Sequence, residues 1–209
     1  MARYLDIPPV DPQPRLIAQA VDVVRGGGLI AYPTDSGYAL GCGLGNQAGK
    51  ARIASIRRLD ERHHYPLVCS SFAQLGQYVL SATSVFRTLK AATPGPYTFI
   101  LPATKEVPRR LLHPKKKTVG VRLPDHTGVA ALLAELGEPL LSSTLLLPGE
   151  QEALTEGWIV NDEIGNLVDV VIEGECGAEP TTVVNLTSGA AVIDRVGAGD
   201  PSLFVDDDD

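Results

Sequence analysis

Apolar runs of strand length recur along this chain, and some lie too close together to be joined by a helix. Residues 29–32 and 38–43 are both apolar, and only the five residues 33–37 separate them. A parallel pair of strands needs a crossover of about a dozen residues, so this pair must be antiparallel. Helical patterns alternate with the other strand patterns, which is typical of an α/β fold. We therefore expect a mixed parallel and antiparallel sheet with flanking helices.

The individual elements follow from periodicity and from turn residues. Asp11 is expected to cap the first helix, with Pro12 in its first turn and the glycines at 26–28 as its end. Further helices are expected at residues 47–57, 72–79, 85–92, 129–136 and 158–164, and further strands at 67–69, 97–101, 118–123, 139–143, 168–172, 182–186 and 191–195. No long linker divides the chain, so we expect one domain over residues 1–205. The four aspartates at 206–209 are expected to form a disordered acidic tail.

Positive charge is concentrated in two short segments of this acidic chain. The net charge is −7, yet 12 of the 18 Lys and Arg residues lie in segments 50–62 and 105–122, with local net charges of +3 and +6. From Leu123 onward, one Arg faces eighteen carboxylates. Such segregation indicates a surface for an anionic ligand.

Several classes of protein are excluded by what the sequence lacks. No apolar run reaches about 18 residues, and the first residues do not have the order of a secretory signal, so we expect a cytoplasmic protein without membrane contact. Three cysteines without C-x-x-C spacing argue against a disulfide framework and a zinc site. His63 and His64 are adjacent and have no third ligand at a familiar offset, so we expect no protein metal site. Both common nucleotide fingerprints, G-x-x-x-x-G-K and G-x-G-x-x-G, are also absent.

Two loops combine hydroxyl groups with residues that shape the backbone. The loop at 32–38 holds Thr34, Asp35 and Ser36 between two strand patterns. Its polar groups either face a crevice, or Asp35 and Ser36 hold a turn by bonding to local backbone. In the loop at 93–98, two prolines and a glycine precede Thr98, which could present backbone amides and a hydroxyl to a phosphate.

The more basic segment ends on a strand pattern. Arg122 has apolar neighbours there, so it is expected to pair with a carboxylate or a phosphate, because an unpaired buried guanidinium is costly. Lys115, Lys116 and Lys117 on their own suggest a solvated loop, but Arg109 and Arg110 lie close in sequence. The combination favours a phosphate-rich partner, and the absence of neighbouring aromatics favours a duplex or folded RNA over a single strand.

Five short motifs occur in an order that resembles the YrdC-like family, and most closely its YciO branch. They are YPTDSGY at 32–38, PGPYTF at 94–99, VRLP at 121–124, PLLSST at 139–144 and PTTVV at 180–184. The resemblance spans residues 13–197 and implies a twisted α/β fold with a concave, positively charged surface. It also implies a nucleotidyltransferase that makes L-threonylcarbamoyladenylate from ATP, L-threonine and bicarbonate for tRNA modification. Mg²⁺ would be held through the ATP phosphates, and double-stranded RNA or tRNA would be a further partner.

Roles carried over by position are hypotheses for individual residues. The resemblance implies substrate-binding roles for Thr34, His64, Arg122, Ser142 and Thr181, nucleotide-binding roles for Arg58, Thr98, Lys117, Thr118 and Arg195, and catalytic roles for Arg57 and Thr144. The basic residues Arg109, Arg110, Lys115, Lys116 and Lys117 would bind RNA. His63 is an alternative to His64 on the threonine side.

Two motifs of the synthases are altered in this chain. The family pattern K-x-R corresponds to Arg57-Arg58-Leu59, and S-x-N corresponds to Thr144-Leu145-Leu146. Loss of one transition-state contact typically costs about 2.7 to 4 kcal/mol, or a factor of about 10² to 10³ in rate. The sequence thus predicts weak synthesis, and the alternative is an RNA-binding module without robust synthase activity.

Overall fold

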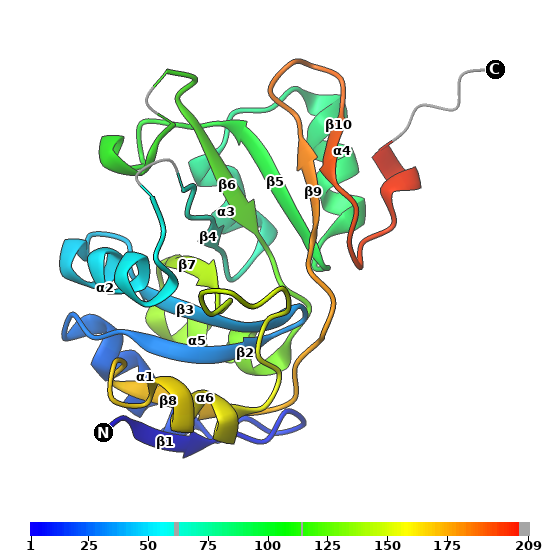
Figure 1. The fold of residues 1–209 in the computed structure, drawn as a ribbon. Helices are drawn as coiled ribbons and strands as arrows, with labels where there is room; N and C mark the ends of the chain where they lie inside the picture. Colours follow the sequence, from blue (N-terminus) through cyan, green and yellow to red (C-terminus); the bar gives the residue numbers. More distant parts are fainter. Residues whose placement is uncertain (61–62, 114, 205–209) are drawn as a thin grey trace.

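A single mixed sheet organises the molecule (Figure 1). The computed structural model describes residues 1–60, 63–113 and 115–204. In these residues the strands are β1 (Arg3–Asp6), β2 (Ile30–Thr34), β3 (Gly37–Gly43), β4 (Leu67–Val68), β5 (Tyr97–Pro102), β6 (Thr118–Arg122), β7 (Leu140–Thr144), β8 (Val170–Glu173), β9 (Thr182–Asn185) and β10 (Val192–Arg195). They join in the order β1-β8-β2-β3-β7-β4-β6-β5-β9-β10.

Six α-helices and two 3₁₀ turns connect the described strands. The helices are α1 (Pro14–Arg25), α2 (Gln47–Arg57), α3 (Phe72–Tyr78), α4 (Thr83–Ala92), α5 (Thr127–Leu136) and α6 (Gly157–Ile164), and the 3₁₀ turns are η1 (Arg109–Leu111) and η2 (Pro201–Phe204). Among the described residues, no helix is long and apolar enough to cross a membrane. The predicted acidic tail at 206–209 lies outside the described residues.

The strand directions confirm the prediction of a mixed sheet. β2 pairs with β3 antiparallel through the short turn that joins Thr34 to Gly37. β5 and β6 are also antiparallel, although residues 103–117 separate them. In contrast, β1 with β8, β4 with β6, and β5 with β9 run parallel. The short connection between β2 and β3 leaves no room for a parallel crossover, as predicted.

The sheet has a hydrophobic core on each face. Ile30 and Tyr32 of β2 pack in one cluster with α1 and α5, whereas Leu29 and Ala31 belong to a larger cluster with α2, α4 and α6. Alternate residues of a strand point to opposite faces, so one strand contributes to both clusters. Helices therefore cover both faces of the sheet around β2.

Two predictions about the first 25 residues were wrong or incomplete. The first helix begins at Pro14, and Gln13, not Asp11, is its N-cap. A proline disfavours helical backbone in the residue before it, and Gln13 is indeed extended with ψ 120°, so the helix cannot include Pro12. Strand β1 was not predicted, because Leu5 is its only buried residue and its pattern is accordingly weak. The other predicted elements are present with shifts at their ends.

Candidate functional site

A cleft of about 650 Å³ collects polar side chains from distant parts of the chain. Strands β5, β6, β7, β9 and β10 contribute to its walls, together with the end of α2 and the connections that follow β7 and β8. Most of the residues predicted for substrate binding, nucleotide binding or catalysis line this cleft: Arg57, His64, Thr98, Thr118, Arg122, Ser142, Thr144, Thr181 and Arg195. Its size is in the usual range for a site that binds a small molecule.

Arg122 is a buried cation in the cleft wall, and it pairs with Asp35 of the β2–β3 turn. The Asp35 carboxylate also accepts a hydrogen bond from the Asp125 amide at 2.9 Å. The predicted pairing of Arg122 with a carboxylate is thereby confirmed. The Nε atom of Arg122 is buried and has no hydrogen-bond partner among the described residues. An unsatisfied buried donor is costly, and most buried polar groups in proteins have a partner.

Thr34, rather than Asp35 or Ser36, holds the turn between β2 and β3. Its hydroxyl donates to the Gly37 carbonyl at 2.7 Å and accepts from the Ser36 amide at 3.1 Å. Thr34 is buried and is not among the cleft-lining residues, whereas Ser36 is. The structure therefore corrects the reading in which Asp35 and Ser36 bond to local backbone, and it gives Thr34 a demonstrable role in the turn.

A second guanidinium, that of Arg195, is fixed near Arg122 by Thr181. Arg195 donates from Nε to the Thr181 carbonyl at 3.0 Å and from Nη2 to the Thr181 hydroxyl at 2.9 Å. The Thr181 hydroxyl also bonds to that of Thr98 at 2.9 Å. Burial and the charge of Arg122 lower the pKa of Arg195. Two like charges held this close favour an anion beside them.

Arg57 supplies a third cation from the C-terminal end of α2. Its Nε donates to the Leu146 carbonyl at 3.3 Å, and its Nη1 donates to the Ser143 hydroxyl at 2.5 Å. The same hydroxyl lies 3.1 Å from Nε2 of His63. Burial lowers the pKa of Arg57. Ser143 was missed from the sequence, where nothing distinguished it from Ser142.

The hydroxyl proton of Ser142 is already used in a hydrogen bond within the protein. It donates to the Leu40 carbonyl at 3.1 Å and lies 2.7 Å from the Tyr32 hydroxyl, which must then be the donor in that second bond. A serine hydroxyl has one proton, so Ser142 can only accept a hydrogen bond from a ligand.

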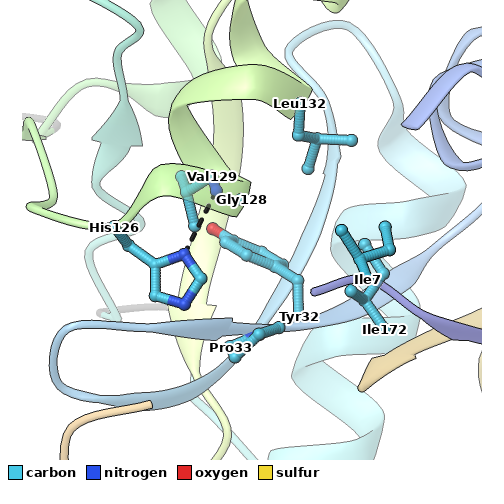
Figure 2. Close-up of a pocket in the computed structure, with 8 residues that line it drawn as sticks. All are labelled: Ile7, Tyr32, Pro33, His126, Gly128, Val129, Leu132 and Ile172. Atoms are coloured by element: carbon cyan, nitrogen blue, oxygen red, sulfur yellow. Dashed lines mark hydrogen bonds between the residues drawn. The ribbon is translucent and has the colours of Figure 1, made fainter. Parts of the chain in front are cut away.

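Tyr32 itself is buried on the α1 and α5 face, where Figure 2 shows it with Val129, Leu132 and Ile172. The space among them is about 10 Å³, roughly that of one water molecule, which excludes a larger ligand.

Several predicted residues lie outside the cleft lining. Arg58 is the exposed C-cap of α2 with φ 52°, and exposed Lys117 also has φ 52° in its turn. Arg109 and Arg110 lie on η1, where Arg110 donates from Nη2 to the Gly45 carbonyl at 3.0 Å. Arg58 and Lys117 therefore do not meet the other predicted nucleotide residues in this structure.

The lysine run is ordered by a histidine. Nδ1 of His113 accepts the amides of Lys115 and Lys116 at 3.2 and 3.0 Å. All three lysines of the run are exposed, and Lys116 lines the cleft together with His113. The rings of His64 and His113 stack with centroids 5.1 Å apart. His64 thus joins the loop before β4 to the basic loop before β6.

The structure shows where the two altered motif positions, Leu59 and Leu146, lie. Leu59 packs partly buried against the larger core cluster, and Leu146 lines the cleft. In the residues that the structure describes, no group of three or more His, Cys, Asp or Glu side chains is arranged to hold a metal ion. The cleft lining combines arginines and hydroxyl groups with the imidazoles of three histidines and the carboxylates of Glu152 and Asp194.

Comparison with known proteins places this fold among described relatives. The Sua5/YciO/YrdC family model, described as telomere recombination, matches residues 22–197. YciO of Escherichia coli is 46% identical over 206 residues, which are 98% of this chain and all of YciO, and a Haemophilus influenzae protein is 46% identical over 207 residues. The crystal structure of E. coli YciO superposes with a TM-score of 0.94. P. abyssi Sua5 complexed with L-threonine has a TM-score of 0.84 at 24% identity, over 93% of this chain and 57% of that one.

Proposed function

Because this chain belongs to the Sua5/YciO/YrdC family, we propose that its cleft binds L-threonine and ATP and makes L-threonylcarbamoyladenylate slowly. The observation that carries the proposal is the buried Nε of Arg122, which has no partner among the described residues and lies in the wall of a cleft large enough for both ligands. The amino-acid carboxylate is the natural acceptor for it. A solved Sua5 structure of the same fold contains L-threonine, which supports the choice of amino acid.

The nucleotide occupies the remainder of the cleft in this proposal. Arg195 and Arg57 lie near its phosphates, and Thr118 and Thr144 are the hydroxyl residues beside it. The carboxylate of N-carboxythreonine, formed from threonine and bicarbonate, attacks the α-phosphorus, and pyrophosphate leaves. Charge neutralisation and alignment are the protein's main contributions to such a transfer. Mg²⁺ enters with ATP and stays on its phosphates.

The synthesis is proposed to be slow because of two side chains. Leu59 packs against the core and cannot add a cation, and the side chain of Leu146 has no hydrogen-bonding group. The Leu146 carbonyl instead accepts from Arg57, an interaction that any residue at this position could supply.

Two measurements test this function. Isothermal titration with L-threonine and MgATP should show binding, and pyrophosphate release should depend on both threonine and bicarbonate. Arg122→Lys should abolish threonine binding, because an ammonium lacks the planar fork of the guanidinium, whereas Arg87→Lys on the exposed face of α4 should not. Absence of threonine binding by the unaltered protein would refute the proposal.

A second candidate is binding of double-stranded RNA or tRNA without robust synthesis. The observation in its favour is the exposed run Lys115, Lys116 and Lys117 at the edge of the cleft, with the amides of the first two held by His113. An ordered run of ammonium groups suits a line of phosphates. RNA binding that weakens with salt, together with no turnover, would favour this candidate over the first.

A further inference from the structure

Three side chains at one wall of the cleft form a continuous hydrogen-bonded chain. The Arg57 guanidinium donates to the Ser143 hydroxyl at 2.5 Å, and that hydroxyl lies 3.1 Å from Nε2 of His63. The three residues come from the end of α2, from β7 and from the loop before β4. They line the cleft, and Ser143 lies within the PLLSST motif, for which the resemblance implied roles for Ser142 and Thr144 but none for Ser143.

The direction of each hydrogen bond follows from the chemistry of the groups. A guanidinium can only donate, so the Ser143 oxygen accepts from Arg57. The single hydroxyl proton of Ser143 can then point to its other neighbour, His63, when Nε2 of that ring is the unprotonated nitrogen. Burial, the charge of Arg57 and the neighbouring His64 lower the pKa of His63 to about 4, which keeps the ring neutral near pH 7. In this tautomer the ring proton is on Nδ1.

We propose that His63 is a positioning residue: by accepting the Ser143 proton it directs the lone pairs of Ser143 at Arg57 and fixes the guanidinium for an anionic ligand. The phosphate group of a nucleotide is the class of ligand that fits, so this step rests on the proposed function. Arg57 is held at two points, by Ser143 and by the Leu146 carbonyl. Among the described residues these are the hydrogen bonds of its guanidinium, and in the proposal its remaining N–H groups face the ligand.

The His63 ring is itself held in place. It meets the ring of Tyr65 edge-on, with centroids 4.9 Å apart and planes at 84°. The Lys50 ammonium lies 5.2 Å from the centre of the Tyr65 ring, which ties this contact back to α2. A ring supported in this way can set the orientation of a hydroxyl without itself touching the ligand.

The tautomer of His63 tests the inference without any ligand or variant. Long-range ¹H–¹⁵N correlation of the unaltered protein at pH 7 should show a protonated Nδ1 and an unprotonated Nε2 for His63. A protonated Nε2 would overturn the proposal, since that nitrogen would then compete with Arg57 as a donor to Ser143. This outcome is independent of whether the protein binds ATP.

Two substitutions of His63 separate its packing from its hydrogen bond. His63→Gln keeps an acceptor near Ser143, whereas His63→Phe keeps the ring against Tyr65 and removes the acceptor. Hydrogen exchange at Nη1 of Arg57, the nitrogen that donates to Ser143, should become about tenfold faster in His63→Phe and in Ser143→Ala, as expected for one lost hydrogen bond, and should change little in His63→Gln. Ser84→Ala on exposed α4 is the matched control and should leave the exchange unchanged. Equal exchange in His63→Phe and the unaltered protein would refute the inference.

The affinity for MgATP tests whether the hydrogen bonds among Arg57, Ser143 and His63 matter for the ligand. His63→Phe should weaken MgATP binding about tenfold, and His63→Gln should restore most of the affinity. If the unaltered protein binds no ATP, the proposed function fails while the tautomer and exchange results still decide the role of His63. If ATP binds and His63→Phe has full affinity, the positioning role fails alone.

Discussion

Arg122 and Asp35 form an ion pair in which both side chains are nearly buried, at 6% and 11% exposure. The two residues are far apart in sequence, since Arg122 ends β6 and Asp35 lies in the β2–β3 turn. Their contact therefore ties the two halves of the sheet together at the wall of the cleft. The pair uses an Nη atom of the guanidinium, whose buried Nε has no hydrogen-bond partner among the described residues.

Replacing Asp35 should be costly for folding. Asp35→Ala leaves a buried guanidinium without its counterion, and removal of one partner of a buried pair costs about 3 to 5 kcal/mol. Urea unfolding should show this loss in the free energy of unfolding, and Asp35→Asn, which keeps an acceptor, should lose less. Asp22→Asn on exposed α1 provides the control and should change little. A loss below about 1 kcal/mol in Asp35→Ala would mean that the pair is not coupled to folding.

Gly177 should be intolerant of a side chain. A Cβ at this position would overlap the backbone of Asp35, and the Gly177 amide donates to the Thr34 carbonyl at 2.9 Å. Gly177→Ala must therefore displace the turn that carries Asp35, with a cost of about 1 to 3 kcal/mol and weaker L-threonine binding. Gly45→Ala has only the end of the Arg110 side chain nearby and should keep both properties. Thermal unfolding and calorimetry provide the two readouts.

His63 should make the protein less stable in acid. Its pKa is about 4 in the folded state, and that of an unfolded histidine is about 6.5, so between these values the unfolded chain binds the extra proton. Stability is complete above pH 6.5 and falls as the pH drops toward 4. Asp60 opposes the shift, whereas Arg57 and His64 contribute to it. Relative to His63→Gln, the unaltered protein should lose about 1 kcal/mol more between pH 7 and 4, because partial exposure reduces the full effect. An equal loss of unfolding free energy between pH 7 and 4 in the unaltered protein and in His63→Gln would contradict this prediction.

Local sequence patterns were sufficient to predict most of the helices and strands. The mixed sheet followed from the five residues between the first two strand patterns, and the polar loops at 32–38 and 93–98 were located from their composition. Strand β1 was not predicted, because its partner β8 is distant in sequence: Arg3 pairs with Val170, 167 positions away. Its single buried residue also leaves little local signal. The start of α1 depended on Pro14, whose effect on Gln13 outweighed a favourable cap at Asp11.

The composition of the cleft was only partly predictable. Arg122 had a recognisable signal, since an arginine among apolar strand residues needs a partner, but the sequence did not reveal that Asp35 is that partner. Ser143 and Ser142 are neighbours on β7 and look alike in sequence. They differ because Ser142 bonds to Tyr32 and Leu40, whereas Ser143 meets Arg57 and His63. Such differences arise from tertiary contacts and leave no local pattern.

The lysine run should account for much of the salt dependence of RNA binding. Each phosphate contact adds about 0.7 to 0.9 to the slope of log Kd against log salt, so replacing Lys115, Lys116 and Lys117 by Ala should flatten it by about 2 to 3. The control is a triple variant of equal charge change at exposed sites on α1 and α4, Arg15→Ala, Arg87→Ala and Lys90→Ala. Fluorescence anisotropy with a short RNA duplex at several salt concentrations measures the slope for the lysine variant and for the control variant. An unchanged slope in the lysine variant would exclude the run as the RNA contact.

Leu146→Asn should increase synthesis, because the family pattern has an asparagine amide at this position of the cleft. Losing such a contact costs a factor of about 10² to 10³, and restoring it in a site shaped around leucine should recover about tenfold. The Leu146 carbonyl that accepts from Arg57 is part of the backbone and is kept. Pyrophosphate release with ATP, threonine and bicarbonate measures the gain.

The neighbouring residue distinguishes this gain from a general effect of a new amide. Leu147→Asn places the same group one position along, where the side chain packs against the core and is not among the cleft-lining residues, so it should lower stability and add no activity. A rate that rises equally in both variants would point to loosened packing instead of a restored contact. A rate that rises in neither would mean that Leu146 does not limit synthesis, and the missing cation at Leu59 would then be the stronger cause.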